Sequence, residues 1–370
     1  GRPLRTREFE IAGQPTAIPV IDIHTVGAGG GSLARIDAGG ALRVGPQSAG
    51  AEPGPICYGQ GGSAVTVTDA HVWLGRLPED AFLGGASTLD REAVRGPLQE
   101  IADGLGTSLE AAAEGIVAVA DTAMERALRV ISVERGYDPA DFSVVGFGGA
   151  GGLHVAELTS RLGALKALIP PDPGLLSAYG MLVSPVTREM SRTVFASAEE
   201  PEVDVTIARV FADLEAQARN EMLEEGAAAE DLSTERWIDA RYRGQSFELQ
   251  VPAEDWVVGF HDAHEERYGY RREQAPVEAV TLRAIVTAPP PTLTATEVAR
   301  ADGPPPTEPT RVVHGGETID ATRVWRSDLA AGHVLEGPLV IQEYSGTTWV
   351  PPGWRVTVDG WGTLHLESGP

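Results

Sequence analysis

Two glycine-rich segments of the chain have the residue types that bind phosphate or nucleotide through backbone groups. They are Thr25–Ser32 (TVGAGGGS) and Gly146–His154 (GFGGAGGLH), and each follows an apolar, β-branched run. Glycine tolerates positive φ angles and lets bare N–H groups approach an anion or a flat base. The candidate cofactor-binding residues are therefore Gly27, Gly29, Gly30, Gly31 and Ser32 in the first segment and Gly148, Gly149, Ala150 and Gly151 in the second.

Both segments also have purely structural interpretations. Because Lys166 is the only lysine, the chain contains no Gly-Lys-Ser/Thr phosphate-binding motif. The second segment is compatible with an ordinary turn between a strand and a helix of an α/β core. The first is compatible with a glycine-rich hairpin whose first strand is Ser32–Asp37.

Polar residues near these segments are weaker candidates for catalysis. Asp22 and His24 could bind a metal or transfer a proton, although isolated residues of this kind on a strand are more often structural. Asp69 forms no recognisable catalytic pair by its spacing. His261 and His264 are spaced i, i+3 on a charged helix, where a solvated helix face is a better interpretation than a metal site.

The composition excludes several classes of function. With 370 residues, 42% of them hydrophobic, the chain is long enough for two or three globular domains. Its net charge of −24 disfavours binding to nucleic acid or to anionic membranes. No apolar run reaches the roughly 20 residues that span a bilayer, and the first residues show no signal-peptide core. We therefore predict a cytoplasmic protein with no nucleic-acid partner and no membrane partner.

The single cysteine, Cys57, excludes intrachain disulfides and multi-cysteine metal sites, and its proline-rich setting predicts a buried structural thiol.

The elements that must position these residues follow from periodicity and turn signals. Residues 1–90 are rich in glycine, proline and short β-branched runs such as Ala64–Thr68, which predicts strands and tight loops rather than helices. A capping box at Thr107–Glu110 begins a long helix that ends before Gly136. The following runs alternate as strand, helix and strand, at Phe142–Phe147, Leu153–Leu162 and Ala164–Ile169, which predicts an α/β domain with a parallel sheet.

The composition changes near residue 199. An acidic helical stretch, Val205–Glu224, precedes alternating strands, a helix at Asp255–Tyr268 and a strand at Val277–Ala288. Residues 289–309 are rich in proline and predict an extended linker, and Arg311–Glu367 predicts a small β-rich domain. We expect one domain at 1–198 and a C-terminal α+β domain with a β-rich end at 199–370.

Several motifs in order along the chain resemble one family, the ATP-dependent hydantoinase/oxoprolinase family, in particular its A (ATPase) subunit of N-methylhydantoinase type. The matching segments are Ile21–Ser32 (IDIHTVGAGGGS), Val44–Gly59 (VGPQSAGAEPGPICYG), Val67–Ala70 (VTDA), Glu134–Pro139 (ERGYDP), Phe147–His154 (FGGAGGLH), Arg241–Gln245 (RYRGQ), Tyr268–Tyr270 (YGY), and Gly337–Pro338 through Glu343 to Thr347–Gly353 (TTWVPPG).

The resemblance implies an α/β, actin-like (RNase H-type) ATPase fold with a C-terminal α+β, β-rich appendage. The implied cofactors are ATP and Mg²⁺ or another divalent cation, with no metal-binding residue assigned. The implied activity is hydrolysis of a cyclic amide of the hydantoin or 5-oxoproline type, completed by a B-type partner subunit in a hetero-oligomer. An acetone- or acetophenone-type carboxylase subunit and a non-catalytic assembly subunit are the alternatives.

By the resemblance, Gly148–Gly151 match the family's adenosine loop and Gly27–Ser32 match its glycine-rich cleft loop. Asp22 and His24 accompany that loop as the catalytic candidates, without a role of their own. The family's phosphate-binding Asp-x-Gly-Gly-Thr strings do not occur in the 370 residues. We therefore expect the N-terminal ATPase half on a further chain or segment, and negligible ATPase activity from this chain alone. We also expect a sheet edge near Arg7–Ile23 that is unpaired within this chain and is covered by another polypeptide.

Overall fold

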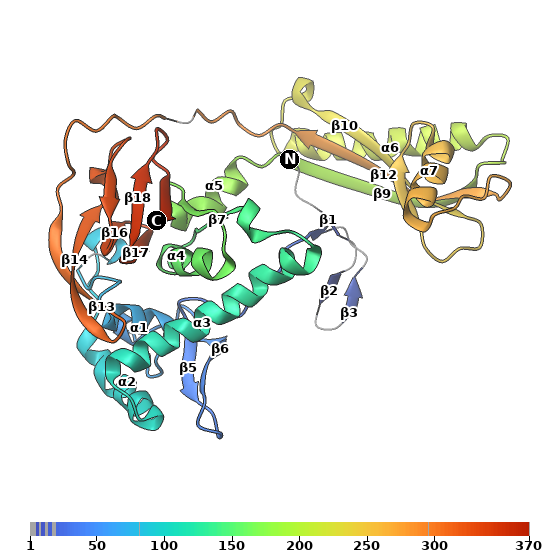
Figure 1. Ribbon diagram of the computed structural model, residues 1–370. Helices are drawn as coiled ribbons and strands as arrows, with labels where there is room; N and C mark the ends of the chain where they lie inside the picture. Colours follow the sequence, from blue (N-terminus) through green and yellow to red (C-terminus); the bar gives the residue numbers. More distant parts are fainter. Residues whose placement is uncertain are drawn as a thin grey trace. The chain divides into compact units, whose positions relative to one another are not determined.

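The computed structural model describes residues 5–6, 9–11, 14–16, 20–80, 82–294 and 296–369. It divides into two compact units, one formed by Gly1–Ser177 together with Ala295–Pro370 and the other by Ala178–Thr294. Figure 1 shows the chain leaving the first unit, forming the second and returning to the first in its last strands. The predicted boundary at residue 198 divides the chain into two continuous segments, whereas the first compact unit is made of two segments that are separate in the sequence. The boundary therefore stays a prediction.

The first unit begins with short strands and three helices. Its elements up to the crossing are β1 (Arg5–Thr6), β2 (Phe9–Ile11), β3 (Gln14–Thr16), β4 (Val20–Ile21), β5 (Ser32–Ile36), β6 (Leu42–Ser48), η1 (Ile56–Tyr58), α1 (Val67–Trp73), η2 (Phe82–Gly85), α2 (Arg91–Leu105), α3 (Leu109–Ile131), η3 (Val133–Arg135), η4 (Pro139–Asp141), β7 (Ser143–Val145), α4 (Gly151–Leu162), β8 (Lys166–Ile169) and η5 (Pro173–Leu175). Helix α5 (Leu176–Leu182) begins in the first unit and continues into the second.

The second unit and the returning segment follow. The elements are β9 (Val186–Ser197), α6 (Val203–Glu224), η6 (Ala229–Asp231), β10 (Ser233–Tyr242), β11 (Leu249–Pro252), α7 (Trp256–Tyr268) and β12 (Val277–Ala288), then β13 (Glu308–His314), β14 (Glu317–Trp325), η7 (Arg326–Asp328), β15 (Val334–Glu336), β16 (Leu339–Glu343), β17 (Gly346–Val350), β18 (Trp354–Val358) and β19 (Leu364–Ser368).

The prediction that residues 1–90 contain no helix is wrong at α1. The Thr66 side chain accepts a hydrogen bond from the Asp69 N–H while the Asp69 carboxylate accepts one from the Thr66 N–H, a complete capping box. This pair begins a helix inside the β-branched run that predicted a strand, because capping and burial outweigh the modest strand preference of such residues. The long helix α3 begins one residue later than predicted, since Ser108 and not Thr107 accepts the capping bond from Ala111 N–H.

The main sheet of the first unit joins distant parts of the chain. Its order is β15-β18-β19-β8-β7, in which β7 and β8 are parallel and the remaining pairs are antiparallel. The predicted parallel pairing is therefore confirmed for β7 and β8, and C-terminal strands extend this sheet through Leu364 opposite Ile169. A second sheet has the order β13-β14-β16-β17, and its strand β17 packs against α4.

The core of the first unit is built around its helices. Ala112, Ala113, Ile116, Val117 and Ala120 recur at helical spacing on α3 and are buried against α1 and α2. Another apolar cluster lies between α4 and the five-stranded sheet. These two clusters fix α1, α3 and α4, the helices that follow or support the glycine segments.

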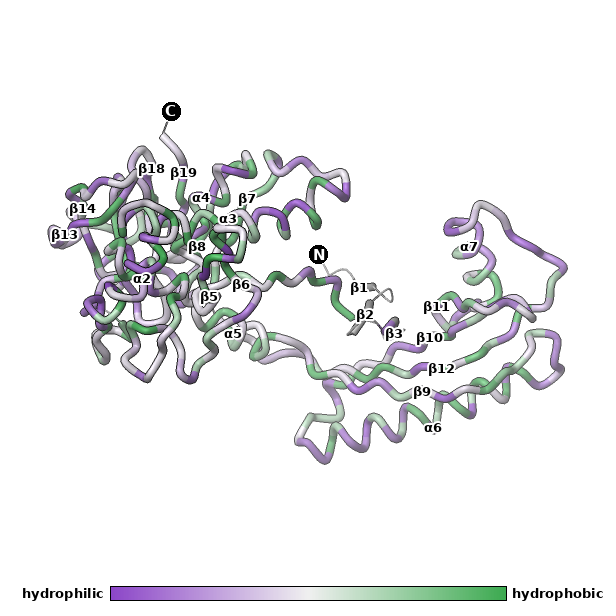
Figure 2. The backbone as a smooth tube through the Cα atoms, turned by 90° about the horizontal axis from the view of Figure 1, so that it is seen from below, coloured by the Kyte–Doolittle hydropathy of each residue, from purple (hydrophilic) through white to green (hydrophobic). Residues whose placement is uncertain are grey.

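The second unit is an antiparallel sheet with helices packed on it. The strand order is β11-β10-β12-β9, and β12 has the bounds that the sequence predicts. Helix α6 packs on β9 and β12, and α7 packs on β10 and β11 (Figure 2). His264 is buried in this core, so the prediction of a solvated helix face is wrong for this residue.

The predicted strand edge at Arg7–Ile23 lies partly outside the described residues. In the described part, β1 pairs with β4 and β2 with β3, each in a two-stranded sheet. The expectation that another polypeptide covers this edge stays a prediction.

Candidate nucleotide-binding site

The two glycine segments lie side by side in the first unit. A Cβ atom placed on Gly30 would lie 3.7 Å from the Cβ atom of Ala150 in the second segment. The Gly30 carbonyl accepts a hydrogen bond from the Thr68 N–H (2.8 Å), so the first segment rests on the N-terminus of α1. Residues that are 120 positions apart in the sequence therefore meet at one place.

The first segment is a tight turn that leads into a hairpin. The Ser32 hydroxyl accepts from Gly29 N–H (3.0 Å), and Ser32 N–H donates to the Gly29 carbonyl (3.0 Å). Strand β5 then pairs with β6, as the hairpin interpretation predicts. A Cβ atom on Gly27 would lie 2.8 Å from Cβ of Pro46, so the chain has no room for a side chain there. The first segment can therefore be both the turn before the predicted hairpin and a ligand-binding turn.

The second segment is an open loop before α4. Gly148 has a φ of +80°, a conformation that favours glycine, and its N–H donates to the Pro173 carbonyl (2.7 Å). Within the described residues, no atom lies within 4 Å of a Cβ atom placed on Gly148, and only the Ser345 carbonyl oxygen, at 3.6 Å, approaches one placed on Gly149. A side chain at Gly148 or Gly149 would therefore point into open space.

The N-terminus of α4 lies at this open loop and has no side-chain cap. Its N-cap residue is Ala150, which has no side chain that can accept a hydrogen bond from the first turn. The free N–H groups at a helix N-terminus, together with the helix dipole, favour an anion or a polar ligand atom. By contrast, α1 has a full capping box, and its Thr68 N–H donates to the Gly30 carbonyl. Of these two helix ends, that of α4 is the one that can receive a ligand.

The turn between β16 and β17 packs against the second segment. A Cβ atom on Gly346 would lie 3.5 Å from the carbonyl oxygen of Gly149, and the Ser345 hydroxyl accepts from Gly174 N–H (3.3 Å). Glu343, the last residue of β16, is buried and lies 3.4 Å from the Arg326 guanidinium. Burial raises the pKa of Glu343 to about 7, and Arg326 offsets part of that rise. Sequence reasoning did not identify these supporting residues as part of the site.

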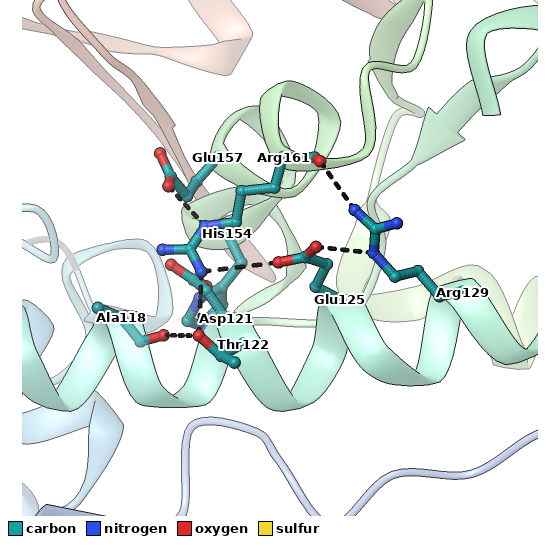
Figure 3. A network of polar contacts seen from close by, with 8 residues as sticks. All are labelled: Ala118, Asp121, Thr122, Glu125, Arg129, His154, Glu157 and Arg161. Carbon is teal, nitrogen blue, oxygen red and sulfur yellow. Dashed lines mark hydrogen bonds and ion pairs between the residues drawn. The ribbon is translucent and has the colours of Figure 1, made fainter. Parts of the chain in front are cut away.

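A buried polar chain joins the helices that carry the segments. His154 Nδ1 lies 2.6 Å from the Asp121 carboxylate, and His154 Nε2 lies 3.4 Å from His71 Nε2. All three side chains are buried. Burial, followed by the nearby His154 and Arg76, holds the pKa of His71 well below its ordinary value. Figure 3 shows Asp121 and His154 beside an outer network of Thr122, Glu125, Arg129, Glu157 and Arg161.

The predicted catalytic residue Asp22 is engaged in an ion pair. Its two carboxylate oxygens accept from Arg135 at 2.6 and 3.1 Å, and these hydrogen bonds hold the pKa of Asp22 below its ordinary value. His24 is exposed two residues further on. The catalytic role of both residues stays a prediction, and the ion pair leaves Asp22 a poor general base in this conformation.

The other polar candidates have structural roles. Asp69 is fully buried and accepts hydrogen bonds from the backbone of η1 and of Thr66. Cys57 is a buried free thiol, as predicted, and burial raises its pKa. The Nδ1 atoms of His261 and His264 lie within hydrogen-bond distance of the Tyr242 hydroxyl and the Tyr270 carbonyl, respectively. Within the described part of the chain, no group of three or more His, Cys, Asp and Glu side chains could hold a metal ion.

None of the described helices is both long and apolar enough to cross a membrane.

Comparison with known proteins connects this geometry to a family. The model of the hydantoinase/oxoprolinase family matches residues 1–190, and the model of the hydantoinase/oxoprolinase C-terminal domain matches residues 195–369. The caprolactamase subunit alpha of Pseudomonas jessenii is 34% identical over 100% of this chain and 56% of its own length. The 5-oxoprolinase of Saccharomyces cerevisiae is 29% identical over 97% of this chain and 30% of its own length.

Solved structures agree with these sequence matches. A nucleotide-free structure of acetone carboxylase, described in connection with ATP-dependent acetone carboxylation, superposes with a TM-score of 0.90 at 26% identity over 99% of this chain and 55% of its own. The ATP-dependent caprolactamase of Pseudomonas jessenii superposes with a TM-score of 0.69 at 33% identity. The chain thus spans about half the length of the carboxylase and caprolactamase chains that it matches. The mixed α/β fold is of the actin-like ATPase type, and the chain belongs to the hydantoinase/oxoprolinase family.

Proposed function

We propose that this chain is part of the ATPase subunit of an ATP-dependent hydrolase of cyclic amides. The observation that carries the proposal is the open loop Gly148–Gly151, which leads into the uncapped N-terminus of α4 and lies against Gly30. A nucleotide needs bare backbone beside its flat base and N–H groups beside its polar atoms, and this loop offers both. Gly148, Gly149, Ala150 and Gly151 would contact adenosine, and Gly27 to Ser32 would form the adjoining wall.

The activity is inferred from the family relatives. Caprolactamase and 5-oxoprolinase are among them, and the first of these is described as ATP-dependent. A lactam carbonyl is a weak electrophile. Transfer of the γ-phosphoryl group to the carbonyl oxygen, with ADP as the leaving group, would let water add to the carbon. The ring C–N bond would then break as the nitrogen takes a proton, and a second water would hydrolyse the resulting acyl phosphate to the carboxylate and free phosphate. ATP would supply this activation, and residues 1–370 would supply the adenosine-binding part of the site.

Other parts of the assembly complete the proposal. The matched caprolactamase and carboxylase chains are about twice as long as this chain, so we assign the phosphate-binding and metal-binding carboxylates to their remaining length. The described residues contain no set of metal ligands of their own. We further propose a B-type partner subunit and a cytoplasmic location, and we expect negligible ATP hydrolysis by residues 1–370 alone.

A carboxylase subunit is the second candidate. The TM-score of 0.90 to acetone carboxylase favours it. Incubating the native complex and ATP with a panel of lactams and hydantoins, and separately with ketones plus bicarbonate, distinguishes the two activities. ATP-dependent ring opening supports the hydrolase, and ATP-dependent uptake of labelled bicarbonate supports the carboxylase.

The Gly149→Val substitution tests the nucleotide site. A Cβ atom at Gly149 meets only the Ser345 carbonyl oxygen, at an ordinary contact distance, so the variant should fold and yet obstruct the ligand space. Gly303→Val is the matched control, since no described atom lies within 4 Å of a Cβ atom there. We expect Gly149→Val to abolish ATP binding by the native complex and Gly303→Val to leave it unchanged. Equal loss of thermal stability and affinity in Gly149→Val would support a plain strand–helix turn instead.

A further inference from the structure

The buried chain Asp121–His154–His71 lies one helical turn behind the two glycine segments. His71 follows Thr68, whose N–H holds the Gly30 carbonyl, by three residues on α1. His154 follows Ala150, the N-cap of α4, by four residues. Because one turn contains 3.6 residues, both histidines lie about one turn inside their helices. Their contact thus joins the two helix ends that carry the two segments.

The hydrogen-bonding groups of this chain fix the positions of its protons. The Asp121 carboxylate lies 2.6 Å from His154 Nδ1, so that nitrogen carries a proton and donates it. When the His154 ring is neutral, its Nε2 is a bare acceptor and His71 Nε2 donates to it across 3.4 Å. His71 Nδ1 is left as a buried lone pair without a partner among the described residues. For neutral rings, one arrangement of tautomers therefore satisfies the contacts on both sides of His154.

This contact is a directional connection between α1 and α4. Other polar contacts, from Arg161 to Thr122 and to Glu125, already join α4 to α3 (Figure 3). Among the hydrogen bonds of the described residues, His71 to His154 is the one that joins α1 to α4. Two apolar side chains of the same size would pack here without a buried polar atom that lacks a partner, such as His71 Nδ1. A buried polar chain instead specifies one relative position of the groups that it connects.

We propose that His71, His154 and Asp121 are positioning residues that hold the two glycine segments at the separation required for nucleotide binding. The inference rests on the proposed function, because it assigns the purpose of that separation to ATP. All three side chains are buried, so none of them is exposed to a ligand in solution. They act through Gly30 and Ala150, which the two helix ends hold.

The test compares variants that keep or remove the donor on α1. His71→Gln retains an N–H group near the position of Nε2, whereas His71→Met has a similar volume and no donor. His154→Asn retains a donor for Asp121 but loses the acceptor for His71. His333→Met is the matched control, a buried histidine in the same unit that lies between η7 and β15 and bonds to the Gly303 carbonyl and the Ala330 N–H.

Hydrogen exchange without nucleotide gives the readout that does not depend on the proposed function. In the native complex, His71→Met and His154→Asn should increase amide exchange in residues 27–32 and 146–152 together, although each change lies in one helix. His71→Gln and His333→Met should leave exchange of both segments at the wild-type rate. Unchanged exchange in His71→Met, or an equal increase in His71→Gln, would overturn the proposal.

Nucleotide titration of the same variants then tests the purpose of the link. We expect His71→Met to weaken ATP binding by roughly tenfold or more, within the range of ordinary site-to-site coupling, and His71→Gln to restore it. Coupled exchange without ATP binding by the wild-type complex would leave the positioning link intact and contradict the proposed function. Nitrogen-15 spectra of the histidine rings should show His154 protonated at Nδ1 and His71 at Nε2. The opposite tautomers would contradict the hydrogen-bond chain.

Discussion

Replacing Asp69 with alanine should destabilise the first unit more than a typical helix-cap substitution does. The Asp69 carboxylate is fully buried and accepts from Ile56 N–H (3.2 Å), Cys57 N–H (2.8 Å) and Thr66 N–H (2.8 Å), as well as from the Thr66 hydroxyl (2.8 Å). Alanine removes every one of these acceptors and leaves three backbone donors inside the core. The same change removes the capping box that begins α1.

The expected magnitude follows from these contacts. A buried donor left without an acceptor costs about 1–3 kcal/mol. Three such donors correspond to roughly 3–9 kcal/mol, and we expect about 4 kcal/mol, because the cavity left by the carboxylate admits water. Since domains unfold with about 5–15 kcal/mol, this loss is a large part of the total.

Urea unfolding provides the assay. Tryptophan fluorescence, to which the buried Trp73 on α1 contributes, follows the transition, and circular dichroism gives an independent signal. Asp90→Ala is the matched control, because Asp90 is the exposed N-cap of α2 and accepts one hydrogen bond, from Ala93 N–H. We expect about 1 kcal/mol for that control. A loss in Asp69→Ala no larger than that of the control would refute the account of Asp69 as a buried acceptor.

Three further predictions concern ionisable groups. The pKa of Glu343 is about 7 in the folded protein and 4.5 ordinarily. The fold therefore favours the protonated carboxyl, and the resulting stabilisation is fully present below pH 4.5 and is lost as the pH rises through 7. The stability of the wild type relative to Glu343→Gln should therefore fall by about 3 kcal/mol between pH 4.5 and 8 in paired urea titrations, and a constant difference would contradict it. Burial raises the pKa of Cys57, so the thiol should resist a disulfide reagent at pH 8 until the protein unfolds, whereas fast reaction with the folded protein would argue against this environment. In Arg135→Ala the pKa of Asp22 should rise, measured by carbon-13 spectroscopy of the carboxyl group, and an unchanged titration would show that the ion pair does not persist in solution.

Local signals predicted much of the fold from the sequence. The strand Val277–Ala288 has the predicted bounds, and the helix α4 and its flanking strands occupy the predicted places, because each has clear periodicity and glycine or proline at its ends. Helix α1 was missed although Thr66 and Asp69 have capping-box spacing, since the β-branched run around them predicted a strand. The pairing of β8 with β19 depends on contacts nearly 200 residues apart, which periodicity does not encode.

The candidate site was predictable in part. The glycine segments could be identified because both their composition and their position after apolar runs are local properties. Their proximity through Gly30 and Ala150 could not, because it depends on the packing of α1, α3 and α4. The support from Ser345 and Glu343 was missed for the same reason, as it comes from a hairpin whose strands lie in a different sheet from β7. His264 is buried although its helix is charged, because it faces Tyr242.

The structure of the native complex with bound ADP, determined by cryo-electron microscopy or crystallography, tests the central claim most directly. We predict that the adenosine moiety contacts the backbone of Gly148–Gly151, with Gly27–Ser32 forming the adjoining wall of the site. We also predict an intact contact between His71 and His154 behind them. A well-defined nucleotide that touches neither glycine segment would contradict the assignment of the site, and with it the proposed roles of both segments.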